Sequence, residues 1–243
     1  MEEKISFFSQ EIMIKANLHI PFPGAPCVIA LHGLEGDKDR GKWPTVASYL
    51  YESGYACLRF NFRGCGEKEK SDGKFEDLTL SGRIEDYKAA LQYIRSEENI
   101  DTERIGVIGS SLGGMVAIAG KQKVKAVVTM GSPYKVPRYG KPLIPRKEGD
   151  HYVLPSGSRF KKDFYEDIQR YNLLRDVRES PPLMIIHGSS DEVVPVEHGK
   201  ILYDNAVEPK ELKIIEGADH TFSSPMHLNE ALRSAREWFN KYL

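Results

Sequence analysis

The run at residues 104–114, Arg-Ile-Gly-Val-Ile-Gly-Ser-Ser-Leu-Gly-Gly, constrains this chain more than any other stretch. Its first part predicts a short buried strand, because residues 105–108 are mainly apolar. A helix is expected directly afterwards, since apolar residues recur from Leu112 onward at helical spacing. Residues 109–113 between them fit the pattern G-x-S-x-G, with Ser111 at its centre. Such a pattern is typical of a serine held on a tight turn from strand to helix.

The residues around Ser111 suit a nucleophile. Gly109 and Gly113 keep side chains out of the corner between strand and helix. The serine then lies at a helix N-terminus, where the helix dipole favours a developing anion and the N–H of Leu112 points outward. The same residues could also form a glycine–serine turn that merely starts a helix. The strand before the motif and the helix after it favour the nucleophile.

Composition limits the classes of function. A chain of 243 residues can form a single domain over 1–243 with one large core. Its formal net charge of -1 provides no general attraction to nucleic acid or to anionic membranes. The first residues do not resemble a signal peptide, and no apolar run approaches the ~18 residues that span a bilayer. We therefore expect a cytoplasmic protein, monomeric or homodimeric, that binds neither nucleic acid nor membrane.

Cysteine and histidine spacing indicates no metal site. The three cysteines lack the spacing of a disulfide framework, and no Cys/His cluster has metal-ligand spacing. Cys27 and Cys57 lie in apolar runs and are expected to be small core residues.

Apolar runs alternate with helical stripes along most of the chain. Buried strands are predicted at residues 27–31, 55–60, 105–108, 124–130, 183–187 and 212–215, after two short strands within 5–20, and helices at 43–50, 84–94, 112–119, 196–205 and 228–242. Thr79 or Ser81 is the expected N-cap of the second helix. This alternation predicts an α/β fold with a mostly parallel central sheet and helices on both faces.

The alternation breaks over residues 132–170, which are rich in proline and weakly periodic. Loops of this length are usually functional, so we interpret about 132–175 as a cap insertion, with a helical segment at 160–174. Apolar residues of the cap are expected to line a pocket: Pro133, Tyr134, Val136, Tyr139, Leu143, Ile144, Tyr152, Val153, Leu154 and Phe160.

Basic residues outnumber acidic ones eight to three over 132–165. The basic residues are Lys135, Arg138, Lys141, Arg146, Lys147, Arg159, Lys161 and Lys162. We expect them to form a solvated face, and the alternative is that they guide an anionic substrate.

A serine hydroxyl needs an adjacent base, and histidine is the usual one. Among seven histidines His220 is the best candidate, because it follows the last predicted strand, and loops after parallel strands line the ligand crevice. Taken alone, it could equally be a surface-loop histidine. Asp191 follows the penultimate strand and is preferred over Glu192 and Asp219 as the carboxylate that orients the base.

Further residues are assigned to the same site. The backbone N–H groups of Leu112 and Leu34 are the expected oxyanion donors, because Leu34 lies in the loop after strand 27–31. His32 is expected to pack or to form hydrogen bonds near the site, and His187 to be a buried support.

Several segments together resemble the α/β-hydrolase superfamily, and within it the cinnamoyl/feruloyl esterases and the serine aminopeptidase-like hydrolases. The matching segments are Leu31-His32-Gly33, residues 59–64, residues 71–77, residues 109–114, residues 191–195 and Asp219-His220. The resemblance covers nearly the whole chain. It implies a triad of Ser111, Asp191 and His220, a small cap and no cofactor.

From the residues and the resemblance we expect a serine carboxylesterase that acts on a small-molecule ester, with aryl or hydroxycinnamoyl esters as candidates. A peptidase or thioesterase with the same triad is the first alternative. The second is a catalytically inactive α/β-hydrolase that serves as a binding module.

Overall fold

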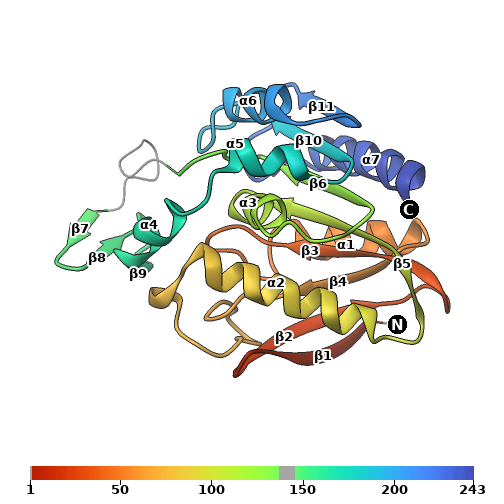
Figure 1. Ribbon diagram of the computed structural model, residues 1–243, viewed down its shortest axis with the longest axis horizontal. Helices are drawn as coiled ribbons and strands as arrows, with labels where there is room; N and C mark the ends of the chain where they lie inside the picture. Colours follow the sequence, from red (N-terminus) through yellow and green to blue (C-terminus); the bar gives the residue numbers. More distant parts are fainter. Residues whose placement is uncertain (1, 137–145) are drawn as a thin grey trace.

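An eight-stranded sheet forms the centre of the computed structural model, which describes residues 2–136 and 146–243 (Figure 1). Its strand order is β1-β2-β4-β3-β5-β6-β10-β11. The strands are β1 (Glu2–Ser9), β2 (Ile12–His19), β3 (Ala25–Leu31), β4 (Ala56–Phe60), β5 (Ile100–Ser110), β6 (Ala126–Met130), β10 (Leu183–Gly188) and β11 (Lys210–Ile215). Only β2 runs antiparallel to its neighbours in this sheet. The predicted mostly parallel sheet is confirmed.

Helices cover both faces of the sheet, as predicted (Figure 1). One face carries α2 (Leu80–Arg95), α3 (Leu112–Ala119), α5 (Leu173–Asp176) and α6 (Glu197–Asn205), and the other carries α1 (Trp43–Glu52) and α7 (Pro225–Tyr242). Strands β3 and β4 are buried along their whole length, because helices cover them on both sides. Thr79 is the N-cap of α2, and its hydroxyl accepts the Gly82 N–H at 3.0 Å.

The segment between β6 and β10 differs from its predicted form. It contains a three-stranded antiparallel sheet of β7 (Arg146–Glu148), β8 (His151–Val153) and β9 (Arg159–Lys161). These strands are too short to leave a period in the sequence. The helix predicted at 160–174 is two short helices, α4 (Asp163–Ile168) and α5, because Asn172 caps a new helix through the Arg175 N–H.

The cap strands and α4 lie at one end of the molecule, beside the start of α2 (Figure 1). Asp167 on α4 accepts the backbone N–H of Ser81 at 2.8 Å, and the Tyr171 hydroxyl lies 2.7 Å from the Ser81 hydroxyl. Lys161 on β9 forms an ion pair with Asp77. The cap is therefore attached to the body through the N-terminal turn of α2.

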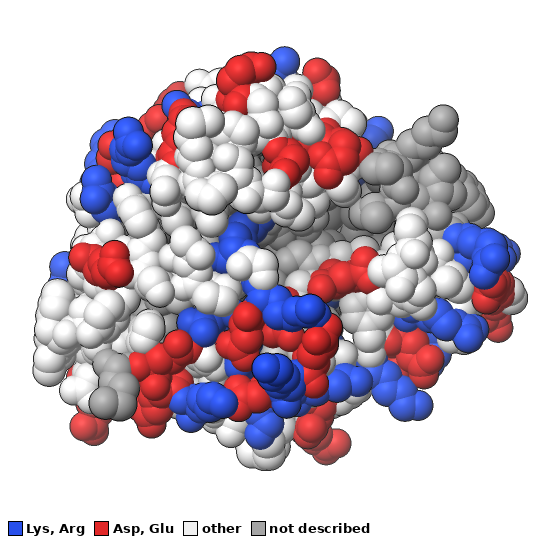
Figure 2. All heavy atoms as spheres, turned by 180° about the vertical axis from the view of Figure 1, so that it is seen from behind, with Lys and Arg blue, Asp and Glu red and all other residues white. Residues whose placement is uncertain are grey.

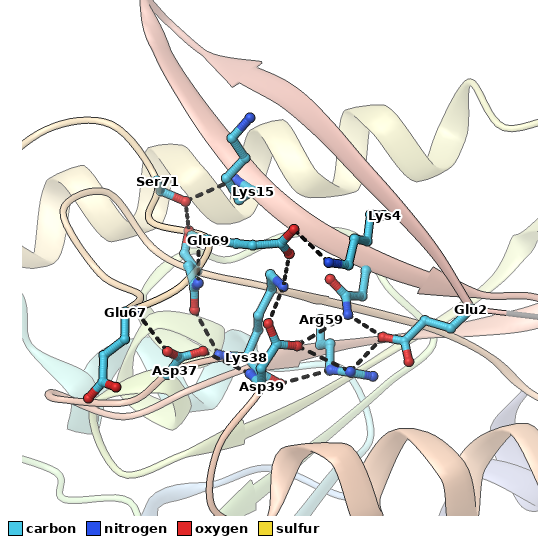
Figure 3. A network of polar contacts seen from close by, with 12 residues as sticks. Glu2, Lys4, Lys15, Asp37, Lys38, Asp39, Arg59, Glu67, Glu69 and Ser71 are labelled. Atoms are coloured by element: carbon cyan, nitrogen blue, oxygen red, sulfur yellow. Dashed lines mark hydrogen bonds and ion pairs between the residues drawn. The ribbon is translucent and has the colours of Figure 1, made fainter.

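A buried lysine fastens the loop after β3 to the neighbouring strands (Figure 3). The side chain of Lys38 is fully buried, and its ammonium contacts Glu69 at 2.8 Å and also Asp39. Its backbone N–H donates to Asn61 at 2.7 Å, and its carbonyl accepts the Nε–H of Arg59 at 2.8 Å. The backbone N–H and C=O of Lys38 are thus both held by side chains of β4 and of the segment after it.

Cys27, Cys57 and Cys65 are buried free thiols, as expected for the first two. No helix in the described part of the chain is long and apolar enough to cross a membrane. Within residues 2–136 and 146–243, no group of three His, Cys, Asp or Glu side chains converges as metal ligands would.

Candidate active site

Ser111 occupies the sharp turn between β5 and α3. Its backbone angles are φ 54° and ψ -122°, a conformation that costs free energy for any residue with a Cβ atom. Hydrogen bonds hold the turn in place: the Ser111 N–H donates to Met130 O at 2.9 Å, and the Gly114 N–H donates to Ser111 O at 3.0 Å. The strained serine is therefore maintained by the structure on both sides of it.

The two glycines of the motif are required by close backbone contacts. A Cβ atom on Gly113 would lie 2.1 Å from Leu31 O, and one on Gly109 would lie 2.5 Å from Gly113 O. The neighbouring Ser110 is the last residue of β5 and only 4% exposed. Ser111 is more exposed and lines both cavities described below.

His220 and Asp191 form a hydrogen-bonded pair. His220 lies in the loop between β11 and α7, and its Nδ1–H donates to Asp191 Oδ2 at 2.8 Å. The other carboxylate oxygen accepts the N–H groups of Val193 at 2.9 Å and Val194 at 2.7 Å. Gly131 makes room for the pair, because a Cβ atom there would lie 3.1 Å from Asp191 Oδ2. The pair is thus fixed in one orientation.

The Asp191 carboxylate is fully buried and stays ionised. Burial acts to raise its pKa, but hydrogen bonds from His187 and His220 hold the pKa well below its usual range. The two rejected acidic residues have other contacts. Glu192 Oε2 lies 3.5 Å from the backbone N of His220, and Asp219 accepts the Ser223 N–H at 3.0 Å.

Two further histidines support the site from behind. His187 is fully buried and its Nε2–H donates to Val194 O at 2.8 Å. His32 Nδ1–H donates to Gly33 O at 2.8 Å, and its Nε2 accepts the Phe62 N–H at 3.1 Å. Burial and the charge of Arg83 lower the pKa of His32 to about 3, so it is neutral. Both histidines are buried and hydrogen-bonded, as predicted.

Two cavities meet at Leu34, Ser111 and Val193. The first lies under the cap, has a volume of about 220 Å³ and is lined mainly by apolar side chains. The second is more open, about 630 Å³, and its lining includes charged residues such as Asp37, Arg40 and Glu67; His220 lines it together with Ser111. Figure 2 shows a hollowed face of the molecule, with acidic and basic side chains intermingled below the hollow. No single sign of charge dominates that face.

The cap contributes only part of the lining that the sequence predicted. Pro133, Val136, Leu154 and Phe160 line the apolar cavity, whereas Tyr134, Tyr152 and Val153 do not. Tyr139, Leu143, Ile144, Arg138 and Lys141 lie outside the described residues. Lys135 is exposed, as expected for a basic residue of the cap, and it also lines this cavity.

The sequence did not predict several other residues that line this cavity, because the pocket was expected to be lined by apolar residues before α4. Phe164 and Tyr165 on α4 line the apolar cavity. Residues 193–195 and His198, which follow β10 in the sequence, line it too. The Tyr134 N–H donates to His198 Nδ1 at 3.3 Å, so this histidine joins the cap to α6. No local pattern marks His198, because its contacts are made by the fold.

The two expected oxyanion donors lie beside Ser111. Leu112 is the first residue of α3, and its N–H therefore has no acceptor within the helix. Leu34 lines both cavities together with Ser111. The backbone at Gly33 approaches the serine closely, since a Cβ atom there would lie 3.2 Å from Ser111 Cβ.

Residues 43–243 match the model of the prolyl oligopeptidase family. The chain belongs to this family. YfhR of Escherichia coli O157:H7, named as uncharacterized, is 28% identical over 199 residues, covering 79% of this chain and 62% of YfhR. This chain thus spans less than two thirds of YfhR. YitV of Bacillus subtilis, named as a candidate esterase, is 28% identical over 242 residues, covering 90% of this chain and 89% of YitV.

Solved structures share the fold of this chain. Est1E from Butyrivibrio proteoclasticus, solved with ferulic acid, superposes with a TM-score of 0.88 at 24% identity over 98% of each chain. The esterase domain of a Rhodothermus marinus protein superposes at 0.78 with 27% identity, over 100% of this chain and 99% of that one. The fold is the α/β-hydrolase fold.

Proposed function

We propose that this chain is a serine carboxylesterase that forms an acyl-enzyme on Ser111. The observation that carries the proposal is a histidine, His220, that is hydrogen-bonded to Asp191 at 2.8 Å and lines the same cavity as a serine held in a strained turn. A serine, a base and an orienting carboxylate are the parts that acyl transfer needs. Their order along the chain, Ser111, Asp191 and His220, is the order of α/β-hydrolases.

The hydrogen bond to Asp191 assigns the protons on His220. Because Nδ1–H donates to the carboxylate, the lone pair lies on Nε2, which accepts the proton of Ser111 as Oγ attacks the ester carbonyl. The buried carboxylate then stabilises the imidazolium. The N–H groups of Leu34 and Leu112 hold the tetrahedral oxyanion.

The intermediate collapses when His220 returns the proton to the alcohol oxygen and the alcohol leaves. His220 next takes a proton from water, and the resulting hydroxide attacks the acyl-enzyme. A second tetrahedral intermediate forms in the same oxyanion hole. Its collapse releases the carboxylic acid and returns the proton to Ser111, so atoms and charge balance over the cycle.

The two cavities divide the substrate at Ser111. The apolar cavity of about 220 Å³ suits the acyl group, with walls that include Leu154, Phe160 and Phe164. The more open cavity, which His220 lines, receives the alcohol. Aryl and hydroxycinnamoyl esters are the proposed substrates, and the ferulic acid bound to Est1E supports this class.

A peptidase is the second candidate, favoured by the family to which residues 43–243 belong. It would use the same residues, with an amine as leaving group. Comparing kcat/KM for a p-nitrophenyl ester and for the matching p-nitroanilide distinguishes the two. An inactive binding module would turn over neither substrate.

The test is covalent labelling of Ser111. We expect burst release of p-nitrophenol from an activated ester and a fluorophosphonate adduct on Ser111 in a peptide digest. Ser111→Ala should lose ~10³-fold or more in kcat while remaining folded. The control, Ser110→Ala, should keep most of the activity. An adduct on Ser110, or no adduct in the wild type, would overturn the proposal.

A further inference from the structure

Arg83, in the first turn of α2, is a buried charge without an ion pair. The residue has no solvent exposure, and burial lowers its pKa. Among the described residues, no carboxylate lies within ion-pair distance of its guanidinium. The neighbouring Asp86 is instead bound by Arg63 at 2.7 Å. Because an uncompensated buried charge is costly, other groups must stabilise Arg83.

Those groups are two consecutive main-chain carbonyls of the loop after β3. Nη1–H donates to Gly33 O at 2.8 Å and Nη2–H donates to Leu34 O at 2.6 Å. The guanidinium also lies over the ring of Phe62, with its carbon 4.7 Å from the ring centroid, and Nη2 lies 3.5 Å from Cys65 Sγ. Both of its hydrogen bonds to carbonyl oxygens are therefore made to the loop that contains Leu34.

These bonds set the direction of the Leu34 N–H. In a planar trans peptide the C=O and the following N–H point in opposite directions. Gly33 O accepts from Arg83 and also from His32 Nδ1–H at 2.8 Å, so the carbonyl is directed at two side chains that line neither cavity. The Leu34 N–H of the same peptide unit then points to the opposite side. Turning the peptide over would break both bonds and leave Nη1 of Arg83 without its carbonyl acceptor.

We infer that Arg83 is a positioning residue for the oxyanion hole. It holds the Gly33–Leu34 peptide so that the Leu34 N–H faces the tetrahedral oxyanion, and it polarises that N–H, since hydrogen bonds in a chain strengthen one another. The inference rests on the proposed function, in which this N–H binds the oxyanion. Arg83 touches no reacting atom.

The loop has a second anchor that is independent of Arg83. Lys38, further along, is held by Glu69 and Asn61 (Figure 3). Losing Arg83 should therefore change the orientation of one peptide and leave the path of the loop in place. This predicts an effect on the rate of the chemical step that is separate from substrate binding.

The experiment compares Arg83→Met and Arg83→Lys with the wild type on a p-nitrophenyl ester and on a trifluoromethyl ketone, whose hemiketal with Ser111 carries an oxyanion. We expect Arg83→Met to lower kcat about 10²-fold, the usual effect of losing one oxyanion donor, with KM within about twofold. The inhibition constant of the ketone should rise in proportion to the loss in kcat/KM. Arg83→Lys keeps the charge but reaches one carbonyl, so its losses should be smaller.

The matched control is Arg63→Met, which removes an arginine bound to Asp86 and Ser9 and not to the loop. It should be less stable but keep the kcat and ketone affinity of the wild type per folded molecule. A loss confined to KM in the Arg83 variants, or an unchanged ketone affinity, would refute the positioning role. If the wild type formed no hemiketal on Ser111, the proposed function itself would fail, which is a different outcome.

A structure of the wild-type hemiketal tests the same inference without any substitution. Leu34 N should lie within hydrogen-bond distance of the hemiketal oxygen while Arg83 remains bonded to Gly33 O. A Gly33–Leu34 peptide turned the other way in that adduct would overturn the inference, even if neither Arg83 variant folds.

Discussion

At the scale of single residues, Asp191 combines burial with a permanent charge. Three donors form hydrogen bonds to the carboxylate, the backbone N–H groups of Val193 and Val194 and the Nδ1–H of His220, and His187 Nε2 lies 3.4 Å from Oδ2. An anion held in this way needs no solvent, and it cannot rotate away from His220. The segment after β10 therefore fixes the orientation of His220, the proposed base.

We expect Asp191→Asn to lower kcat by about 10²–10⁴, because the amide favours the wrong tautomer of His220 and no longer stabilises its cation. KM should change little. Steady-state kinetics on a p-nitrophenyl ester measures both. Glu192→Gln is the control and should have only a mild effect on kcat, since Glu192 lies near the backbone N of His220 and not near its ring. The reverse pattern would show that Glu192 is the acid.

At the scale of elements, two parts of the cap supply walls of the apolar cavity. Leu154 and Phe160, before α4, meet Phe164 from α4 around it. Aromatic contacts join these elements, with Phe160 and Phe164 ring centroids 5.1 Å apart. Because the cavity wall comes from an insertion outside the main sheet, we expect the cap to change specificity without changing the chemistry.

Leu154→Trp should narrow the cavity and select against large acyl groups. We expect kcat/KM for acetyl esters to stay within about threefold of the wild-type value. For hydroxycinnamoyl esters kcat/KM should fall ~10-fold or more, mainly through a higher KM, because the larger acyl group no longer fits the apolar pocket. The control is Val153→Trp, at a half-buried neighbour that does not line the cavity. An unchanged substrate ranking in Leu154→Trp, with the protein folded by circular dichroism, would contradict the cap assignment.

At the scale of the whole molecule, a charged network ties the N-terminal hairpin to the body (Figure 3). Glu69 accepts from Lys38 at 2.8 Å and from Lys4 on β1 at 2.9 Å. The hydrogen bond from Lys38, followed by the one from Lys4, lowers the pKa of Glu69 from 4.5 to about 2. The network therefore contributes to folding only while Glu69 is ionised.

This lowered pKa predicts the pH dependence of stability. A carboxylate whose pKa is depressed by folding stabilises the native state above its unfolded pKa of about 4.5, and the contribution is lost as pH falls toward about 2. Glu69→Gln should therefore be less stable than wild type at pH 7, and the difference should shrink as the pH is lowered below about 4.5. Urea unfolding across this range measures it.

The control for this prediction is Glu67→Gln, at an exposed residue paired with Arg40 on the surface. Exposed ion pairs contribute little to the free energy of unfolding. The stability of Glu67→Gln should therefore differ little from that of the wild type at every pH. A Glu69→Gln difference that stayed constant from pH 7 to pH 3 would contradict the role assigned to the ionised carboxylate.

Local signals were enough to predict the layered sheet and the turn at Ser111. Buried strands such as β3 leave continuous apolar runs, and the spacing of Gly109 and Gly113 reflects contacts made within a few residues and across to β3. The strand ends also placed His220 and Asp191 in loops at the same edge, where the structure finds them 2.8 Å apart. These features depend on backbone geometry that short sequence patterns record.

Only the tertiary structure decided the roles of Arg83, Lys38 and His198. Arg83 is four residues before the buried Tyr87, so helical spacing could have indicated its burial, but its acceptors lie about 50 residues away. In the sequence Lys38 lies in a charged run, which is typical of a solvated residue. In the structure it is buried and paired with Glu69, 31 residues further along the chain. The partners of a buried charge are the groups that the fold brings near it. Because those groups lie far away along the chain, no periodic pattern in the sequence indicates them.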